Sequence, residues 1–156
     1  MSGLTICLWY DDEAEEAARF YVQAFRDAGK PAELGPTMRQ GVDTPVLTAE
    51  FTLDGQRFVG LNGGPAFKPT MAHSLMVECR DQAQIDHFWS RLSQGGETSQ
   101  CGWLIDRWGY AWQILPAEMM AMVRDPDRGR GERVFRAMQG MTKLDIAALR
   151  AARDAG

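Results

Sequence analysis

The sequence contains few cysteines and no long apolar run. Cys7, Cys79 and Cys101 lie far apart and form no Cys-x-x-Cys pair, so buried reduced thiols are expected rather than a disulfide framework or a zinc site. No segment approaches the roughly 18–20 apolar residues of a membrane helix, and the N-terminus lacks the pattern of a signal peptide. We therefore expect a cytoplasmic protein without a membrane partner.

Clustered positive charge is also scarce. The 156 residues include 17 Lys and Arg against 21 Asp and Glu, which gives a formal net charge of −4. Arginines gather only in residues 124–136, where acidic residues interleave with them and indicate a solvated helix face. Because a phosphate backbone is bound by a clustered basic surface, no nucleic-acid partner is expected.

Tryptophan is concentrated in one stretch. Three of the five tryptophans lie in Gln100–Pro116, whose centre, Asp106–Gly109, has the composition of a tight turn between two strand-like runs. The stretch predicts a β-hairpin. If its turn closes symmetrically, Trp103 faces Trp112 across the two strands. Gln113 is a polar residue among the apolar residues of the second strand-like run.

One order of elements occurs twice along the chain: strand, helix, loop or short strand, hairpin. The predicted elements of the first copy are a strand at Thr5–Tyr10, a helix with its N-cap at Asp12, a short edge strand near Thr37–Gln40, and a hairpin from Val46 to Asn62 that turns at Asp54-Gly55. Those of the second copy are a strand at Met71–Cys79, a helix with its N-cap at Asp81, a short strand at Glu97–Gln100, and the Trp-rich hairpin.

This repeat predicts the α+β class, with βαβββ modules at residues 1–70 and 71–116. A helical extension at 117–156 completes one structural domain, with helices expected at Glu118–Arg124, Glu132–Met141 and Leu144–Arg153. Neither module alone can bury both its helix and its sheet, so we expect the two to pack together around a concave surface. The extension either covers a sheet edge or packs on a second subunit.

Several motifs within this layout carry a family resemblance: Leu8-Trp9-Tyr10, the acidic helix start Ala14–Tyr21, Leu61-Asn62-Gly63-Gly64-Pro65, Cys101-Gly102-Trp103-Leu104, Trp112-Gln113-Ile114 and the C-terminal Leu144–Leu149. With them the chain resembles the vicinal oxygen chelate superfamily, also called the glyoxalase/bleomycin-resistance/dioxygenase fold. Within it, the chain is most similar to the PhnB-like branch, often labelled 3-demethylubiquinone-9 3-methyltransferase-like.

The resemblance implies where a metal would bind. Metal-using members place a His or Gln on the first strand of each module and a Glu on the last. Alignment of the modules puts Ser74 and Gln113 at these positions in the second, and Ile6 or Cys7 with Asn62 or Leu61 in the first. Neutral amides and a hydroxyl are poor ligands for divalent ions, so no metal is predicted.

The methyltransferase label implies a cofactor site. A Rossmann-type site needs a glycine-rich turn that opens a helix. Gly60–Pro65 is glycine-rich but follows a hairpin and runs into a proline. No cofactor is therefore predicted.

Two functions remain open. The first is a homodimeric binding module that holds a small, partly apolar molecule in the cleft between its sheets, lined by Trp9, Asn62, Ser74, Trp103 and Gln113. The alternative is an enzyme of glyoxalase, dioxygenase or methyltransferase type, which would need a ligand set other than the residues identified above or one assembled across a subunit interface. A purely structural dimer is a third interpretation.

Overall fold

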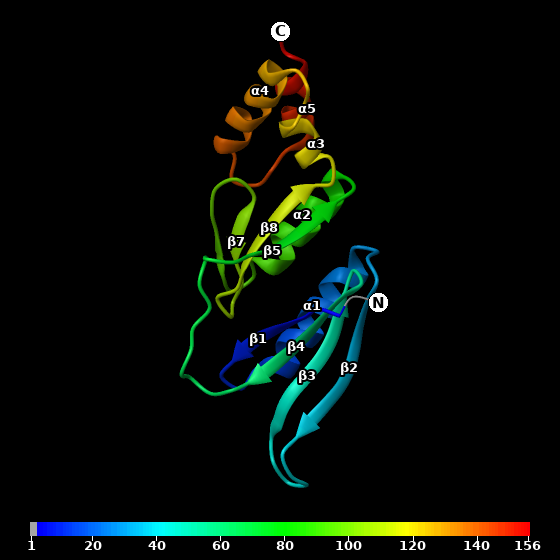
Figure 1. Cartoon of the computed structure of the whole chain (residues 1–156), viewed down its shortest axis with the longest axis vertical. Coiled ribbons are helices and arrows are strands. Elements are labelled where there is room, and N and C mark those ends of the chain that lie inside the picture. Colours follow the sequence, from blue (N-terminus) through cyan, green and yellow to red (C-terminus); the bar gives the residue numbers. More distant parts are fainter. Residues whose placement is uncertain (1–2) are drawn as a thin grey trace. The chain divides into compact units, whose positions relative to one another are not determined.

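The computed structural model describes residues 3–156, which form two compact units divided between Pro69 and Thr70. Each unit contains a four-stranded mixed sheet with one long helix packed on one face (Figure 1). The predicted α+β class and the repeated βαβββ order are confirmed. The units are described one at a time.

The first unit contains one helix and four strands: β1 (Thr5–Tyr10), α1 (Ala14–Asp27), β2 (Ala32–Arg39), β3 (Val46–Leu53) and β4 (Gln56–Asn62), with the sheet order β1-β4-β3-β2. β1 runs parallel to β4, and the other neighbours are antiparallel. The predicted turn between β3 and β4 is confirmed. Asp54 and Gly55 both have positive φ, 50° and 84°, and Leu53 pairs with Gln56, as in a two-residue type I′ turn.

The core of this unit lies between α1 and one face of the sheet. Tyr21 of α1 is fully buried and packs on Phe51, which stacks on Phe58 with ring centroids 5.1 Å apart. Strand residues alternate between faces. Leu8 and Tyr10 of β1 are accordingly buried on the helix side, while their neighbours lie on the opposite, open face.

Two predictions for this unit are wrong. β2 is an eight-residue strand rather than a short one near Thr37–Gln40, and the sequence signal is weak because every residue except Ala32 is exposed on this edge strand. Asp12 does not cap α1. The helix begins at Ala14, whose backbone N–H donates to the side chain of Asn62, 48 residues away, at 2.8 Å. A cap supplied from a distant strand cannot be predicted from local spacing.

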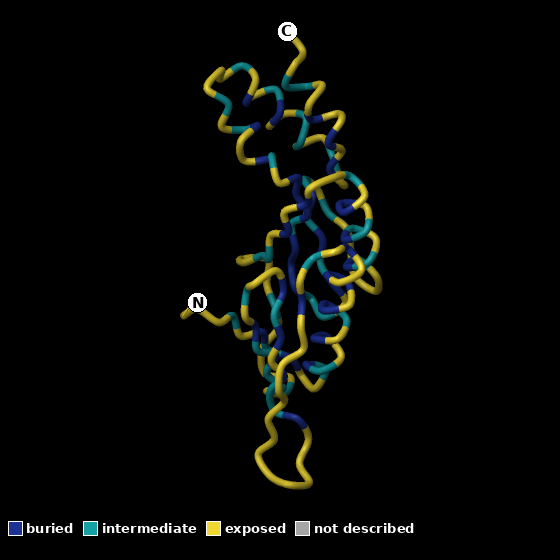
Figure 2. Tube along the Cα trace, turned by 90° about the vertical axis from the view of Figure 1, so that its right-hand side faces the viewer, coloured by how far each residue is buried: buried dark blue, intermediate teal, exposed yellow. Residues whose placement is uncertain are grey.

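The second unit repeats the order with β5 (Leu75–Cys79), α2 (Gln82–Leu92), β6 (Glu97–Thr98), β7 (Trp103–Ile105) and β8 (Ala111–Pro116), in the sheet order β5-β8-β7-β6. The predicted cap of α2 is confirmed, since the Asp81 carboxylate accepts from the backbone N–H of Gln84 at 2.8 Å. Ile85 and Phe88 of α2 are fully buried. Figure 2 shows the buried positions where helix and sheet meet, and the exposed tip of the β2–β3 hairpin.

Three helices follow β8: α3 (Met119–Val123), α4 (Arg128–Gln139) and α5 (Ile146–Asp154). They bury a cluster that includes Leu115 of β8, Val134, Leu144 and Leu149. The segment before α5 also binds the sheet unit directly, because the backbone N–H groups of Cys101 and Gly102 donate to the carbonyls of Met141 and Thr142, both at 2.8 Å. The extension therefore packs on its own unit. No helix within residues 3–156 is long and apolar enough to cross a membrane.

The register of the Trp-rich hairpin differs from the symmetric prediction by one residue. Trp103 pairs with Gln113 and Leu104 pairs with Trp112, so the two indoles lie on opposite faces and do not meet. The cause is a three-residue loop, in which Gly109 has φ 93° and its N–H donates to the Asp106 carbonyl at 2.9 Å. A loop of this kind adds a bulge that a symmetric two-residue turn lacks.

Candidate functional site

Two of the predicted site residues form a polar pair in the second unit. The side-chain amide of Gln113 donates to the hydroxyl of Ser74 at 2.7 Å. Both side chains are half-buried. Gln113 lies between buried Trp112 and Ile114 on β8, so strand alternation directs it to the face of the sheet opposite α2.

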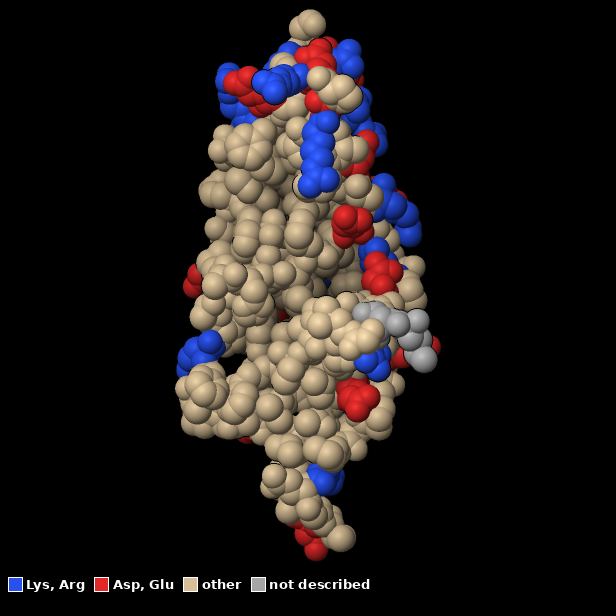
Figure 3. Space-filling model, viewed as in Figure 1, with Lys and Arg blue, Asp and Glu red and all other residues tan. Residues whose placement is uncertain are grey.

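A third predicted residue lies next to this pair. Gln113 is directly opposite Trp103 on β7 and Met76 on β5, so the three residues form one row across the open face of the sheet. Trp103 is half-buried, and Met76 is 53% exposed. Figure 3 shows that few charged atoms lie on this face, while Lys, Arg, Asp and Glu crowd the C-terminal helices. The arrangement is an apolar surface with one amide and one hydroxyl at its centre.

The two predicted residues of the first unit point to opposite faces of its sheet. Trp9 lies on the open face, where its indole N–H donates to the Gly64 carbonyl at 2.8 Å and its ring meets Phe67 edge-on with centroids 4.9 Å apart. Asn62 points to the α1 side, since its amide caps Ala14 and donates to the Val46 carbonyl at 3.1 Å. Trp9 and Asn62 are therefore not brought together.

The two candidate first-strand residues lie on opposite faces of β1. Cys7 lies on the open face of β1, whereas Ile6 shares the helix face with Leu8. Partial burial raises the pKa of the Cys7 thiol. Within residues 3–156 no three His, Cys, Asp or Glu side chains are grouped so as to hold a metal ion. With a neutral amide and hydroxyl at the corresponding place in the second unit, the donors present do not fit a divalent ion.

The glycine-rich segment after β4 does not fit a nucleotide-type cofactor. Gly63 lies directly against the Trp9 ring, and a Cβ there would lie 2.2 Å from a ring carbon. Gly64 has φ 86° and offers its carbonyl to the same indole. The glycines thus allow the chain to fold over Trp9, and the segment leads into a loop rather than a helix.

Sequence reasoning missed two residues that shape this region. Met76 lies two positions after Ser74, and the period of two in a strand was the signal that places both on one face. Asp106, which is 2% exposed, accepts from the backbone N–H groups of Trp108 and Tyr110 at 3.0 Å and from the Trp112 indole at 2.8 Å. It therefore fixes the hairpin that presents Trp103 and Gln113.

Comparison with known proteins places this fold in a family. The sequence profile described as 3-demethylubiquinone-9 3-methyltransferase matches residues 2–115. The C-terminal Leu144–Leu149 stretch thus lies outside the match. A search of curated proteins finds no significant match.

Among solved structures, the chain is similar to a putative 3-demethylubiquinone-9 3-methyltransferase, a PhnB protein, from Bacillus cereus. The two are 30% identical over 74% of this chain and 100% of that one, with a TM-score of 0.66. A protein from Pseudomonas aeruginosa is 16% identical over 74% and 98%, with a TM-score of 0.60. A fosfomycin resistance protein from Listeria monocytogenes, in complex with Mn(II) and a dihydroxypropylphosphonic acid, is 16% identical over 74% and 93%, with a TM-score of 0.53. The last two share the fold alone.

Proposed function

This chain belongs to the PhnB-like family described as 3-demethylubiquinone-9 3-methyltransferase, and we propose that it is a binding protein for a small, partly apolar molecule, held without a metal. The observation that carries the proposal is the hydrogen bond between Gln113 and Ser74 at 2.7 Å on an open sheet face. Trp103 and Met76 extend that face on either side.

The chemistry of this surface suits a ligand with one or two polar groups. Ligand sites are mostly apolar, with a few polar groups that fix orientation. The bond to Ser74 uses one N–H of Gln113, which leaves its amide with a second N–H and a carbonyl oxygen to offer. Trp103 supplies a broad rigid surface, and Met76 adapts its shape readily. In the first unit, Trp9 and Asn62 remain proposed ligand residues, with Asn62 acting through the position of α1.

We also propose a homodimer in the cytosol. Met71 and Phe135 are each 48% exposed, and a second copy would cover such apolar side chains at a gain of about 25 cal/mol for each Å² of apolar surface removed from water. Light scattering coupled to size exclusion tests the dimer. The three free cysteines suit a reducing compartment.

The test of binding combines elemental analysis with a thermal-shift screen of small aromatic and aliphatic compounds. Protein purified without chelator should contain no stoichiometric transition metal. A compound at 100 times its Kd should stabilise the protein by about 2.7 kcal/mol. The shift should disappear in Trp103→Ala and Gln113→Leu, and it should persist in Gln23→Leu, a substitution at an exposed position of α1.

One outcome would replace the proposal with the metal-dependent enzyme. This is a stoichiometric transition metal that is lost in Gln113→Ala, since it would show that the amide oxygen belongs to a ligand set completed elsewhere. Compounds whose shifts are unchanged in Trp103→Ala and Gln113→Leu would equally overturn the site.

A further inference from the structure

The first unit contains a cavity that neither the family match nor the proposed site explains. Its volume is about 330 Å³, within the range of small-ligand sites. All four strands of the sheet contribute to its lining, and the lining residues on the open face are Thr5, Glu33, Glu50, Thr52, Arg57 and Val59. Two carboxylates and one guanidinium therefore share a single cavity with two hydroxyls and one apolar side chain.

Strand register arranges these residues in two rows on the open face. One row crosses the neighbouring strands β1, β4, β3 and β2. It consists, in that order, of the paired residues Thr5, Arg57, Thr52 and Glu33. Glu50 pairs with Val59 in the neighbouring row. Arg57 and Glu50 are thus diagonal neighbours, at roughly 7–8 Å between Cα atoms. Glu33 lies two strands from Arg57, at roughly 10 Å.

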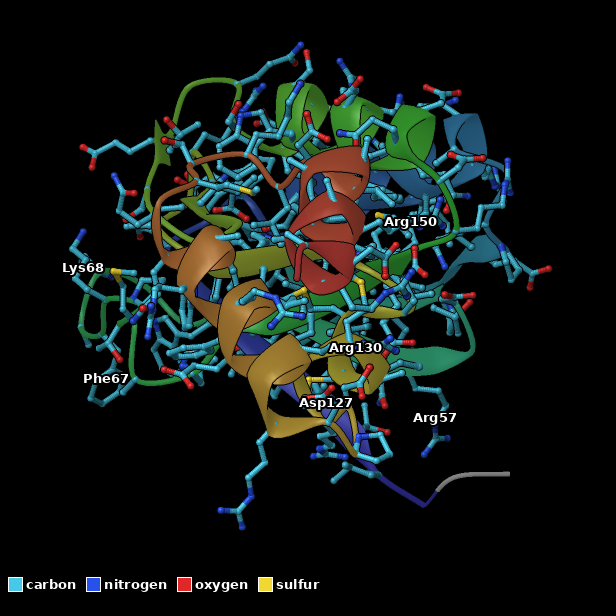
Figure 4. All side chains as sticks on the ribbon, turned by 90° about the horizontal axis from the view of Figure 1, so that it is seen from above. Arg57, Phe67, Lys68, Asp127, Arg130 and Arg150 are labelled. Atoms are coloured by element: carbon cyan, nitrogen blue, oxygen red, sulfur yellow. The ribbon has the colours of Figure 1, made fainter. Side chains whose placement is uncertain are left out.

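These charges are not used within the protein. Among residues 3–156, the side chains of Arg57, Glu33 and Glu50 form no hydrogen bond and no ion pair. Elsewhere in the same unit an ion pair does form, between Lys30 and Asp54 at 2.6 Å. In Figure 4 the Arg57 side chain extends outward from its strand. Both the cationic and the anionic groups of the cavity therefore remain available to a ligand.

We infer that this cavity binds a small zwitterion with an apolar substituent, of the class of hydrophobic α-amino acids. The ammonium group of such a molecule pairs with Glu50 and Glu33, and its carboxylate accepts from Arg57, whose planar guanidinium suits bidentate binding. Val59, which pairs with Glu50 on the open face, supplies apolar contact for the substituent. This site lies in the first unit and does not depend on the proposed site around Gln113.

The cavity also explains a glycine on β2. A Cβ on Gly35 would lie 3.0 Å from the Cβ of Glu50 and 3.2 Å from its carbonyl oxygen, which are tighter contacts than a side chain there usually has. The register of β2 shifts at this point, between Leu34 and Thr37. Glycine thus lets the edge strand run close over Glu50 and form a wall of the cavity.

The test uses three probes that share a phenyl group. L-phenylalanine has both charges, 2-phenylethylamine has only the ammonium, and 3-phenylpropanoate has only the carboxylate. By isothermal titration with the full chain, L-phenylalanine should bind at least about tenfold more tightly than either single-charge probe, because it alone can form charge-assisted hydrogen bonds with both the carboxylates and the guanidinium. Arg57→Gln should reduce its affinity to that of 2-phenylethylamine, and Glu50→Gln should weaken both amines while sparing 3-phenylpropanoate.

Matched controls separate this site from the rest of the protein. Arg19→Gln on α1 and Glu78→Gln on β5 make the same charge changes outside the cavity and should leave the Kd of L-phenylalanine unchanged. Circular dichroism should show that Arg57→Gln is folded, since Arg57 is exposed. The inference is overturned if L-phenylalanine has a Kd above about 10 mM, if it binds no more tightly than the single-charge probes, or if Arg57→Gln leaves its Kd unchanged. None of these results would change the conclusion about the proposed site in the second unit, which is tested by compounds whose thermal shift is lost in Trp103→Ala and Gln113→Leu.

Discussion

Asn62 offers a direct test of how this fold holds its first helix. Its side-chain oxygen accepts from the N–H of Ala14, and its amide group donates to the carbonyl of Val46. Asn62→Ala removes both hydrogen bonds. Loss of a helix cap costs about 1 kcal/mol, and loss of the second hydrogen bond costs about 1 kcal/mol more. The variant should therefore be destabilised by about 2 kcal/mol in the first unit.

Amide hydrogen exchange measures this effect locally. A loss of about 2 kcal/mol corresponds to roughly thirtyfold faster exchange in the amides of α1, because each 1.4 kcal/mol is a factor of ten. Asp81→Ala, which removes the cap of α2, is the matched control and should accelerate exchange in α2 instead. Asn62→Asp should fall between wild type and Asn62→Ala. It keeps the acceptor at the helix N-terminus, where negative charge is favourable, but loses the donor to Val46.

The structural assignment of Asn62 would be refuted by a specific result. If Asn62→Ala changes exchange in α1 by less than about twofold, the side chain does not support the helix.

Two further predictions concern the second unit. Asp106→Asn should lower the unfolding free energy by about 1–3 kcal/mol in urea titration, because an amide N–H₂ would meet the Trp112 indole N–H or leave that buried donor unpaired. Combination with Trp112→Phe should recover part of this loss, and fully additive losses would contradict the contact. The Lys143 ammonium, 2.7 Å away, holds the pKa of Asp86 below its usual range. This pair should stabilise the fold only above the unfolded pKa of the carboxyl and lose that contribution as pH falls through the folded value. An NMR titration in which Lys143→Gln leaves the Asp86 midpoint unmoved would refute it.

Residues close in sequence were predicted well. The Asp54-Gly55 turn sets the register of its own strands, because positive φ at both positions is a local property. The Asp81 cap likewise needs only a contact three residues away. The repeated pattern of apolar residues was enough to indicate two βαβββ modules, because each helix and strand must bury one face.

Contacts between distant residues were decided only by the tertiary structure. The cap of α1 comes from Asn62 in another strand, and the extra residue in the loop after Asp106 moves Trp103 opposite Gln113 rather than Trp112. The charged residues that line the cavity of the first unit, Arg57, Glu33 and Glu50, lie on one face because the four strands pair in one register. The sequence by itself thus determined which segments form strands and helices, since those depend on local propensity and periodicity. Which side chains share a face, a cap or a cavity depended on registers that chain packing alone fixes.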